Sequence, residues 1–430
     1  MGTRIKTSKH TTKYANFGKR EMLRTFLKDY VSAVNFYIDY IWCSRLTRED
    51  KQGTIYVSDI QNEMYDLPKF ISTVGNTPDN CELSARALKC ASSEAIGIVK
   101  SITNKIRKAK FKLDVAISLG DEKKIEIARK KLNDIKFSKP NPRKTLSANL
   151  NSTCCEFIED DFREFSGFLV LKSIGKKYGK ICIPIKNHRH TNKLLKNDWE
   201  RKTTWLIYSD SVCSTWEKES ADPKEEGNKI GLDQGVVTCI TLSDGQTTGK
   251  DIHGHDLHSV MSKLARKKKG SKAYKKAQTH RENYINWSVK QLNFDGIKEI
   301  GFENVRGYIQ TTRFLSGWSY TTIEKAIEER CLEEGVLLTK QNSPYRSQRC
   351  SQCGFVHKSN RKSKKFKCRE CGFEIDADLN GAINHELELI ALPDGLFRSG
   401  LNRNEGFYWK PTMVITKDGE VLTVPPAIKT

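Results

Sequence analysis

Residues 350–372 read CSQCGFVHKSNRKSKKFKCRECG, and this stretch contains two Cys-x2-Cys pairs. Two cysteines with two residues between them wrap a tight knuckle around one metal ion, and the glycine after each pair permits the turn. Four thiolates complete a tetrahedral shell with no open position, so we expect a structural Zn²⁺ site at Cys350, Cys353, Cys368 and Cys371. An iron site and unliganded thiols are the alternatives.

The segment between the two cysteine pairs is strongly basic. Its cationic side chains are Lys358, Arg361, Lys362, Lys364, Lys365 and Lys367. A loop with this charge is typical of a contact with nucleic acid, and the alternative is a solvated loop.

The whole chain is basic as well. Its 430 residues include 74 Lys+Arg and 52 Asp+Glu, which gives a formal net charge of +22. This excess indicates a polyanionic partner, because each neutralised phosphate releases counterions and strengthens binding. The alternative is a cationic protein that adheres to anionic surfaces without using them.

The sequence shows neither a membrane-spanning segment nor a secretory signal, which argues against a membrane or secreted protein. No stretch is apolar enough for a membrane span and no secretory signal is visible, so we expect a soluble cytoplasmic protein. The thirteen cysteines are odd in number, which predicts reduced thiols. The nine that precede residue 350 lack ligand spacing, and we expect them to be buried small residues.

Hydrophobic patterning divides the first half of the chain. Between residues 19 and 136, apolar residues recur at three- and four-residue steps, which predicts mostly helix. Two prolines and a charge cluster at 139–144 end this region. Strands are then expected at 168–171, 181–185 and 205–208, and a charged linker at 217–228.

From residue 229 the pattern is that of an α/β unit. A strand that opens at Ile230 is expected to continue to Leu242, followed by a long basic helix over 258–292. A strand at 299–303 and a helix at 321–334 precede the cysteines. A hairpin is expected around Asp418-Gly419 near the C-terminus.

Three acidic residues occupy positions that suit metal binding. Asp233 follows a short apolar strand, Glu303 ends the apolar run Ile300-Gly301-Phe302, and Asp378 stands where a helix begins. Each alone is weak evidence, because a carboxylate at a strand end is usually just solvated.

The ordered set of motifs resembles the RuvC-type nuclease domain of transposon-encoded TnpB proteins and small type V CRISPR effectors. A four-cysteine ribbon between the second and third acidic motifs is specific to this group, and the clear match covers about residues 229–388. The matching motifs are Ile230-Gly231-Leu232-Asp233-Gln234-Gly235, Ile300-Gly301-Phe302-Glu303-Asn304-Val305, Ser347-Gln348-Arg349-Cys350-Ser351-Gln352-Cys353-Gly354 and Asp376-Ala377-Asp378-Leu379-Asn380-Gly381-Ala382.

The resemblance implies that Asp233, Glu303 and Asp378 are the catalytic carboxylates and hold two Mg²⁺ ions, which hydrolyse a phosphodiester bond. Asp376 is expected to cap the helix instead. Gly381 departs from the family, which often has Ala there, as do Asn304 and the stretch Pro344-Tyr345-Arg346. None of these departures removes a metal ligand, which favours cleavage over the nuclease-dead relatives.

The resemblance also implies a multidomain α+β architecture. An RNase H-like (RuvC) nuclease with an inserted zinc ribbon follows a β-barrel-like wedge domain, itself interrupted by a helical recognition insert. The expected segments are wedge 1–18 and 139–227, helical insert 19–138, nuclease 228–345 and 375–390, zinc ribbon 346–374, and C-terminal tail 391–430.

The implied function is RNA-guided cleavage of double-stranded DNA for a mobile genetic element, by a monomer or dimer on one guide RNA. A guided repressor without cleavage, a type V CRISPR immune effector and a direct transposase are the alternatives. The expected phosphate contacts are Lys263, Arg266, Lys267, Lys268, Lys269, Lys272, Lys275, Lys276, Arg361, Lys362, Lys364 and Lys365. Trp42, Tyr274 and Trp287 either stack on bases or belong to the core.

Overall fold

The computed structural model describes residues 2–47, 81–118, 120, 122–136, 139–160, 164–304, 320–342, 344–393 and 395–422. The chain forms two compact units, one running from Ile5 to Lys218 and the other from Glu219 onward together with the first four residues. Three predictions lie wholly or partly outside the described residues: the helical region at 48–80, Val305 of the second acidic motif, and the tail at 423–430.

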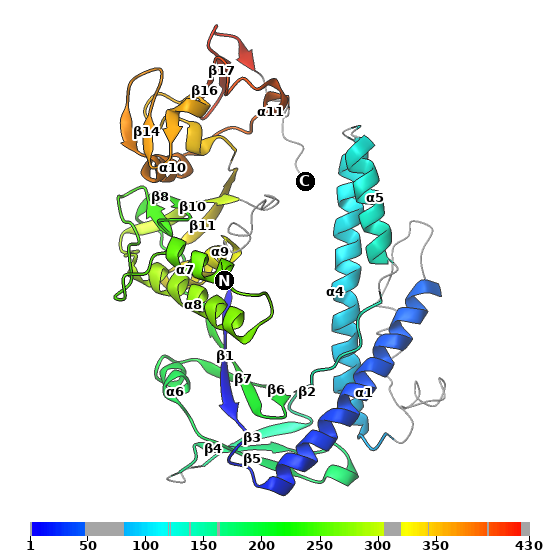
Figure 1. Ribbon diagram of the computed structural model, residues 1–430. Helices are drawn as coiled ribbons and strands as arrows, with labels where there is room; N and C mark the ends of the chain where they lie inside the picture. The colour runs from blue at the N-terminus through cyan, green and yellow to red at the C-terminus, as the bar shows by residue number, and fades with distance from the viewer. Residues whose placement is uncertain are drawn as a thin grey trace. The chain divides into compact units, whose positions relative to one another are not determined.

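Long helices dominate one part of the first unit (Figure 1). They are α1 (Phe17–Thr47), α4 (Ala85–Ser118) and α5 (Glu122–Lys136). The apolar stripe of α1 is confirmed, since Phe26, Tyr30, Val34 and Tyr37 are all buried in one core. Trp42 is buried there as well, which favours the core interpretation over base stacking.

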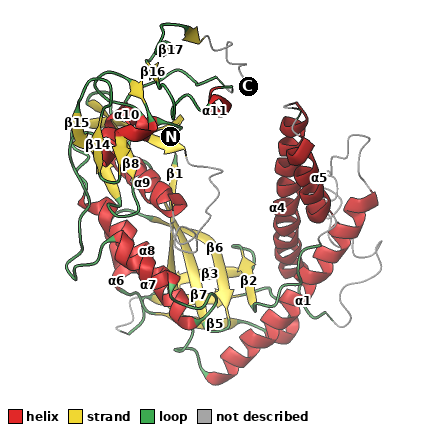
Figure 2. Ribbon diagram, turned by 45° about the horizontal axis from the view of Figure 1, so that its top comes forward, coloured by secondary structure: helices red, strands yellow, loops and turns green. Residues whose placement is uncertain are grey.

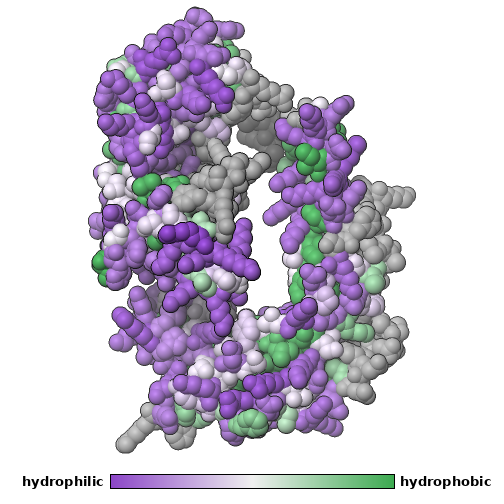
Figure 3. Space-filling view, in the orientation of Figure 1, coloured by the Kyte–Doolittle hydropathy of each residue, from purple (hydrophilic) through white to green (hydrophobic). Residues whose placement is uncertain are grey.

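Helices α4 and α5 lie side by side in both ribbon views (Figures 1 and 2). A groove between them is lined by alanines together with Val115 and Ile127. Figure 3 shows hydrophobic patches along this pair of helices in a surface that is otherwise mostly hydrophilic.

Two antiparallel sheets complete the first unit, and their inner residues share the core of α1 and α4. The strand orders are β1-β7-β6-β2 and β3-β4-β5. The strands predicted at 168–171, 181–185 and 205–208 are confirmed. The elements are β1 (Thr3–Thr11), β2 (Ser147–Leu150), β3 (Cys155–Glu159), β4 (Gly167–Leu171), η1 (Lys176–Tyr178), β5 (Ile181–Ile185), α6 (Arg189–Lys196), β6 (Glu200–Tyr208) and β7 (Ser211–Glu219).

The second unit is built around a four-stranded sheet of order β11-β10-β8-β9. Strands β8, β10 and β11 are parallel, and β9 is antiparallel to β8. The prediction of one strand from Ile230 to Leu242 is therefore wrong, because a turn at 235–239 reverses the chain between β8 and β9. The strands are β8 (Asn228–Gln234), β9 (Ile240–Leu242), β10 (Ile297–Asn304) and β11 (Leu337–Asn342).

Helices pack against this sheet, and two of them replace the single helix predicted over 258–292. The predicted helix is interrupted before Ser271, where Gly270 has a φ of +82° that residues with a side chain rarely adopt. Ser271 then caps the next helix, because its hydroxyl accepts from the Tyr274 N–H at 3.1 Å. Trp287 packs against the apolar core here. The helices are α7 (Leu257–Ala265), α8 (Lys272–Gln291), α9 (Tyr320–Glu334) and α10 (Ala377–Glu386).

The cysteine segment and the C-terminal residues form small sheets. Strand β12, which follows the first cysteine pair, pairs with β16 and so belongs to the same sheet as the hairpin that was predicted around Asp418-Gly419. The elements are η3 (Arg346–Gln348), β12 (Phe355–Val356), η4 (Lys358–Asn360), β13 (Arg361–Lys362), β14 (Lys365–Lys367), β15 (Glu374–Asp376), α11 (Leu396–Ser399), β16 (Phe407–Trp409), β17 (Val414–Thr416) and β18 (Val421–Leu422).

No disulfide joins any of the thirteen cysteines. The prediction that the first nine are buried is wrong at Cys43, which is exposed, and only partly right at Cys81 and Cys182, which are half-buried. A cysteine can lie on the solvent-exposed face of a helix, and the spacing of cysteines in the sequence does not show which face each one occupies. Among the described residues, no helix is long and apolar enough to cross a membrane.

Helix α10 lies directly on the central strands. Gly231 of β8 and Gly301 of β10 are paired in register, and both face the helix. A Cβ atom at Gly231 would stand 1.8 Å from the Ala382 carbonyl oxygen, and one at Gly301 would stand 2.0 Å from that of His385. The helix backbone therefore approaches as closely as it does only because neither strand carries a side chain there.

We expect Gly231→Ala to destabilise the protein by about 1–3 kcal/mol, because its methyl group meets backbone atoms that cannot rotate away. Thermal and urea unfolding measure the change. Gly97→Ala is the matched control, since Gly97 lies in α4 with no atom within 4 Å of its added Cβ, and alanine favours helix. Equal stability of the two variants would contradict the close approach.

Candidate functional site

An acidic site forms where three elements of the second unit meet. Asp233 stands near the end of β8, and Glu303 stands near the end of its parallel neighbour β10. Their carboxylate oxygens and a ring nitrogen of His385, from α10, lie within 4.8 Å of one another. Asp233 is 8% exposed and His385 is 2% exposed, whereas Glu303 is half-buried, so the cluster is shielded from water mainly on the side of Asp233 and His385.

Asp378 enters the same region from the first turn of α10. Asp376 caps this helix as predicted, accepting from the backbone N–H groups of Asp378 at 2.9 Å and Leu379 at 3.1 Å. The Asp378 carboxylate itself is buried, and its charge acts on Asp233. The structure thus brings together all three carboxylates that the resemblance singled out.

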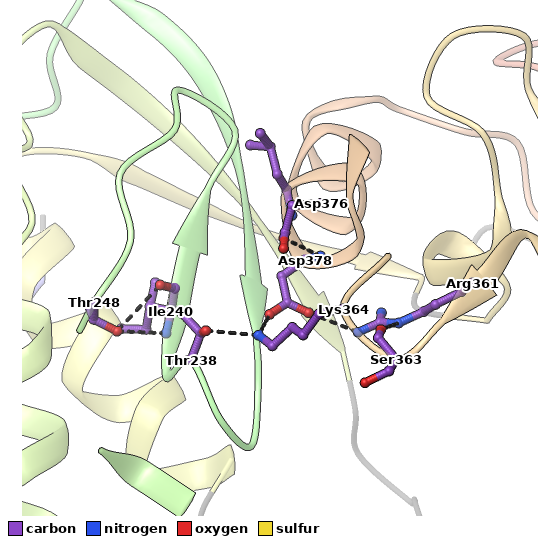
Figure 4. Close-up of polar contacts among 9 residues, drawn as sticks. Thr238, Ile240, Thr248, Arg361, Ser363, Lys364, Asp376 and Asp378 are labelled. Atoms are coloured by element: carbon purple, nitrogen blue, oxygen red, sulfur yellow. Dashed lines mark hydrogen bonds and ion pairs between the residues drawn. The ribbon is translucent and has the colours of Figure 1, made fainter. Parts of the chain in front are cut away.

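Two cations from the cysteine segment contact Asp378 (Figure 4). The Arg361 Nη2 atom lies 2.9 Å from its Oδ1, and Lys364 Nζ forms an ion pair with Oδ2. Lys364 also donates to the Thr238 hydroxyl at 2.8 Å. These two residues, predicted as nucleic-acid contacts, therefore lie inside the acidic site.

Burial makes these carboxylates hard to ionise together. Burial first, and then the charges of Glu303 and Asp378, hold the pKa of Asp233 well above its usual range. Burial likewise raises the pKa of Glu303 to about 7. Hard divalent cations prefer oxygen ligands, and a bound cation removes this mutual repulsion, so the residues fit Mg²⁺.

The Asp233 carboxylate packs against α10 at Gly381, which has no side chain to displace it. A Cβ atom at residue 381 would lie 3.0 Å from Asp233 Cγ, which is tighter than ordinary van der Waals contact. An alanine at this position would therefore require the Asp233 carboxylate to shift by a few tenths of an ångström.

The four predicted zinc ligands converge at a second centre. All four Sγ atoms lie within 4.8 Å of one another, with 3.8 Å between Cys350 and Cys371 and 3.6 Å between Cys353 and Cys368. Zinc–sulfur bonds of about 2.3 Å in a tetrahedron place sulfur atoms about 3.8 Å apart. The donor set and its spacing fit Zn²⁺.

The two cysteine knuckles have the same backbone geometry. The Gly354 N–H donates to the Cys350 carbonyl at 2.9 Å, and the Gly372 N–H donates to the Cys368 carbonyl at 3.1 Å. Both glycines have positive φ, +82° and +75°, as their role in the turn requires.

Buried arginine and asparagine side chains join α10 to the segment before the first knuckle. Arg349 Nη1 donates to Asn384 Oδ1 at 2.5 Å, and Arg349 Nε donates to the Trp409 carbonyl at 2.7 Å. The side-chain amides of Asn380 and Asn384 each donate to the Arg349 carbonyl at 2.8 Å. Sequence reasoning missed this network, although asparagines four residues apart share a helix face.

His385 was also missed as a site residue. It stands seven residues after Asp378 in α10, and a spacing of two helical turns puts both residues on one face. That periodicity was the available signal.

The basic residues of α7, α8 and the turn between them remain a predicted phosphate-binding surface. Lys267 is half-buried, and the other members are exposed, namely Lys263, Arg266, Lys268, Lys269, Lys272, Lys275 and Lys276. In the cysteine segment, Lys362 and Lys365 are exposed as well.

Comparisons with known proteins agree with the motif resemblance. Residues 320–385 match the family described as Cas12f1-like, TNB domain. The CRISPR-associated endodeoxyribonuclease Cas12f1 of Syntrophomonas palmitatica is 32% identical over 123 residues, 28% of this chain and 24% of the relative. The putative RNA-guided DNA endonuclease InsQ of Escherichia coli is 26% identical over 230 residues, 43% of this chain and 57% of the relative.

The fold is also similar to a solved structure, that of the Cas12f1–sgRNA–target DNA complex. The TM-score is 0.55 at 13% identity, over 86% of this chain and 83% of that one. The sequence matches span less than two thirds of either relative's length. By sequence and fold, the chain is similar to TnpB-like small type V effectors.

The crowded carboxylates predict a specific dependence of stability on pH. The folded protein holds the Glu303 proton up to about pH 7, whereas the unfolded chain releases it near 4.5. Folding therefore binds a proton in this range, and stability falls as pH rises, by at most about 1.4 kcal/mol per unit. We expect Glu303→Gln to gain stability relative to wild type between pH 5 and 7.5 in buffers without divalent metal.

Unfolding by urea at each pH measures this difference. Glu299→Gln is the control, because Glu299 lies on the same strand but pairs with Lys229 at 2.8 Å. A constant difference between Glu303→Gln and wild type across the range would contradict the raised pKa.

Proposed function

We propose that this chain is an RNA-guided DNA endonuclease of a mobile genetic element, which hydrolyses phosphodiester bonds of target DNA. The observation that carries the proposal is the cluster of buried Asp233 and Asp378 with half-buried Glu303, in a chain similar to proteins named as a CRISPR-associated endodeoxyribonuclease and a putative RNA-guided DNA endonuclease. Crowded carboxylates with raised pKa values are typical of functional sites, and carboxylates that hold a metal suit phosphodiester chemistry.

The sheet topology supports an RNase H-like (RuvC) nuclease domain. Parallel strands β8 and β10 present one carboxylate each at the same end, β9 runs antiparallel beside β8, and α10 covers the sheet. The four-cysteine centre, inserted between β11 and α10, supports the zinc ribbon. In the proposed layout, residues 1–18 and 139–227 form the wedge, 19–138 the recognition insert and 391–430 the tail.

Asp233, Glu303 and Asp378 would hold Mg²⁺ in this site. When bound, the metal would activate a water molecule and stabilise the charge that develops on the leaving oxygen. The protein's own contribution is to fix the carboxylates and to exclude bulk water from them. Arg361 and Lys364 hold the Asp378 carboxylate and add positive charge where a phosphate would approach.

We expect Asp233→Asn to reduce DNA cleavage by about 100-fold or more while leaving binding of guide RNA and target unchanged. Asp244→Asn is the matched control, because Asp244 is exposed in the turn after β9. Cleavage of a labelled target and gel-shift binding measure the two effects. Full cleavage by the Asp233→Asn variant would rule out the acidic site as the catalytic centre.

Sequencing the RNA that copurifies with the protein tests the guided part of the proposal. We expect one discrete RNA species, and its absence would contradict RNA guidance.

A repressor would silence its target equally well with Asp233→Asn, and a direct transposase would recombine the ends of its element without RNA. Transposon ends or a CRISPR array in the neighbouring DNA would separate a mobile-element protein from an immune effector.

Loss of Mg²⁺ and loss of Zn²⁺ should have different effects, the first on DNA cleavage and the second on the stability of the fold. Removing Mg²⁺ is expected to abolish cleavage and spare RNA binding. Cys353→Ser is expected to lose one bound zinc and to lower the melting temperature, because a four-thiolate site contributes folding energy directly. Cys43→Ser, at an exposed thiol outside the cluster, is the control. Zinc content by mass spectrometry that is unchanged in Cys353→Ser would contradict the assignment.

A further inference from the structure

A cluster of imidazoles and a carboxylate lies outside both centres described above. Asp251 and His255 belong to the loop that connects β9 to α7, and His280 lies in the middle of α8. One ligand atom from each of these residues lies within 4.8 Å of the other two. All three side chains are half-buried, so the cluster is formed by the fold and still reaches solvent.

The loop holds the Asp251 carboxylate in a fixed position. Its Oδ1 atom accepts from the backbone N–H groups of His253 and His255, both at 2.9 Å. The Asp251 N–H donates to the His255 carbonyl, and the Gly254 N–H donates to the Asp251 carbonyl, each at 2.9 Å. With Oδ1 engaged in this way, Oδ2 is turned toward His255. Carboxylates that ligate metals are commonly fixed by such backbone donors.

His255 faces that oxygen across a long contact. Its buried Nδ1 atom lies 3.4 Å from Asp251 Oδ2, which is longer than most hydrogen bonds between side chains. Ligand atoms at about 2.1 Å from a tetrahedral metal are about 3.4 Å apart. The separation therefore suits two ligands that share a cation better than it suits a direct hydrogen bond.

His280 completes the set from α8. Its ring stands edge-on to that of His255, with 5.1 Å between the ring centroids. The loop is also attached to α8 by the Tyr284 hydroxyl, which donates to the Gly249 carbonyl at 2.8 Å. The backbone around the cluster is thus already held together.

We propose that Asp251, His255 and His280 form a binding site for a borderline divalent cation such as Zn²⁺, which ties the β9–α7 loop to helix α8. Two imidazoles and one carboxylate suit Zn²⁺, and water completes the shell on the solvent side. Mg²⁺ prefers oxygen ligands throughout and is a poor match for two imidazoles. The bound ion would brace the pair of helices that carries the basic residues from Lys263 to Lys276.

Zinc stoichiometry of the full-length protein tests the site. The proteins are dialysed against low-micromolar ZnCl₂ with excess Mg²⁺, and bound zinc is measured by mass spectrometry. We expect His255→Gln, His280→Gln and Asp251→Asn each to bind one zinc ion fewer than wild type. Asp251→Asn retains an oxygen for the two backbone donors and removes only the charge, so the loop keeps its turn.

His253→Gln is the matched control. His253 lies in the same loop and is exposed, but its side chain is outside the cluster. We expect this variant to bind as much zinc as wild type. Wild-type zinc content in the three ligand variants would overturn the proposal. An equal loss in His253→Gln would also overturn it, because it would indicate nonspecific binding to surface histidines. Since the count is a difference between variants, it does not depend on the cysteine centre or on cleavage activity.

Discussion

The backbone of helix α10 lies in contact with β8 and β10, and this contact requires Gly231 and Gly301. The same helix carries Asp378 and His385, so its close approach brings them to the carboxylates of Asp233 and Glu303. Gly381 extends the constraint to the helix side, where it leaves space for the Asp233 carboxylate. Three small residues thus determine how tightly the acidic groups crowd, and crowding with burial raises the pKa of Asp233.

Charge balance links the acidic site to the cysteine centre. Arg346 and Arg349 are buried, and burial lowers the pKa of each to about 10, so both remain cationic at neutral pH. Arg349 lies close enough to Cys350 and Cys353 for thiolate charge to favour its charged form. Four thiolates around the proposed Zn²⁺ would carry net negative charge, and the buried Arg349 beside them would offset part of it. Arg349 also donates hydrogen bonds to Asn384 of α10 and to Trp409 of β16, so it connects the cysteine centre to both elements.

Local patterns predicted the parts of the site that depend on short stretches of sequence. The knuckle spacing revealed the cysteine cluster, and apolar runs that end in Asp233 and Glu303 revealed two strand ends. The ion pairs of Arg361 and Lys364 with Asp378 were not predictable in this way, because they depend on how β13, β14 and β15 pair. The break in the predicted 258–292 helix shows a different limit, since a single glycine and a serine cap outweighed a long helical pattern.

The order of elements along the chain has a consequence for biosynthesis. Asp233 and Glu303 are translated before the cysteine segment, and α10 follows it. A nascent or truncated chain that ends between residues 368 and 376 therefore carries Asp233, Glu303 and the cations Arg361 and Lys364, but lacks α10 with Asp378 and His385. Partial translation products are consequently unable to assemble the acidic cluster. The protein acquires its complete site only after α10 has been translated.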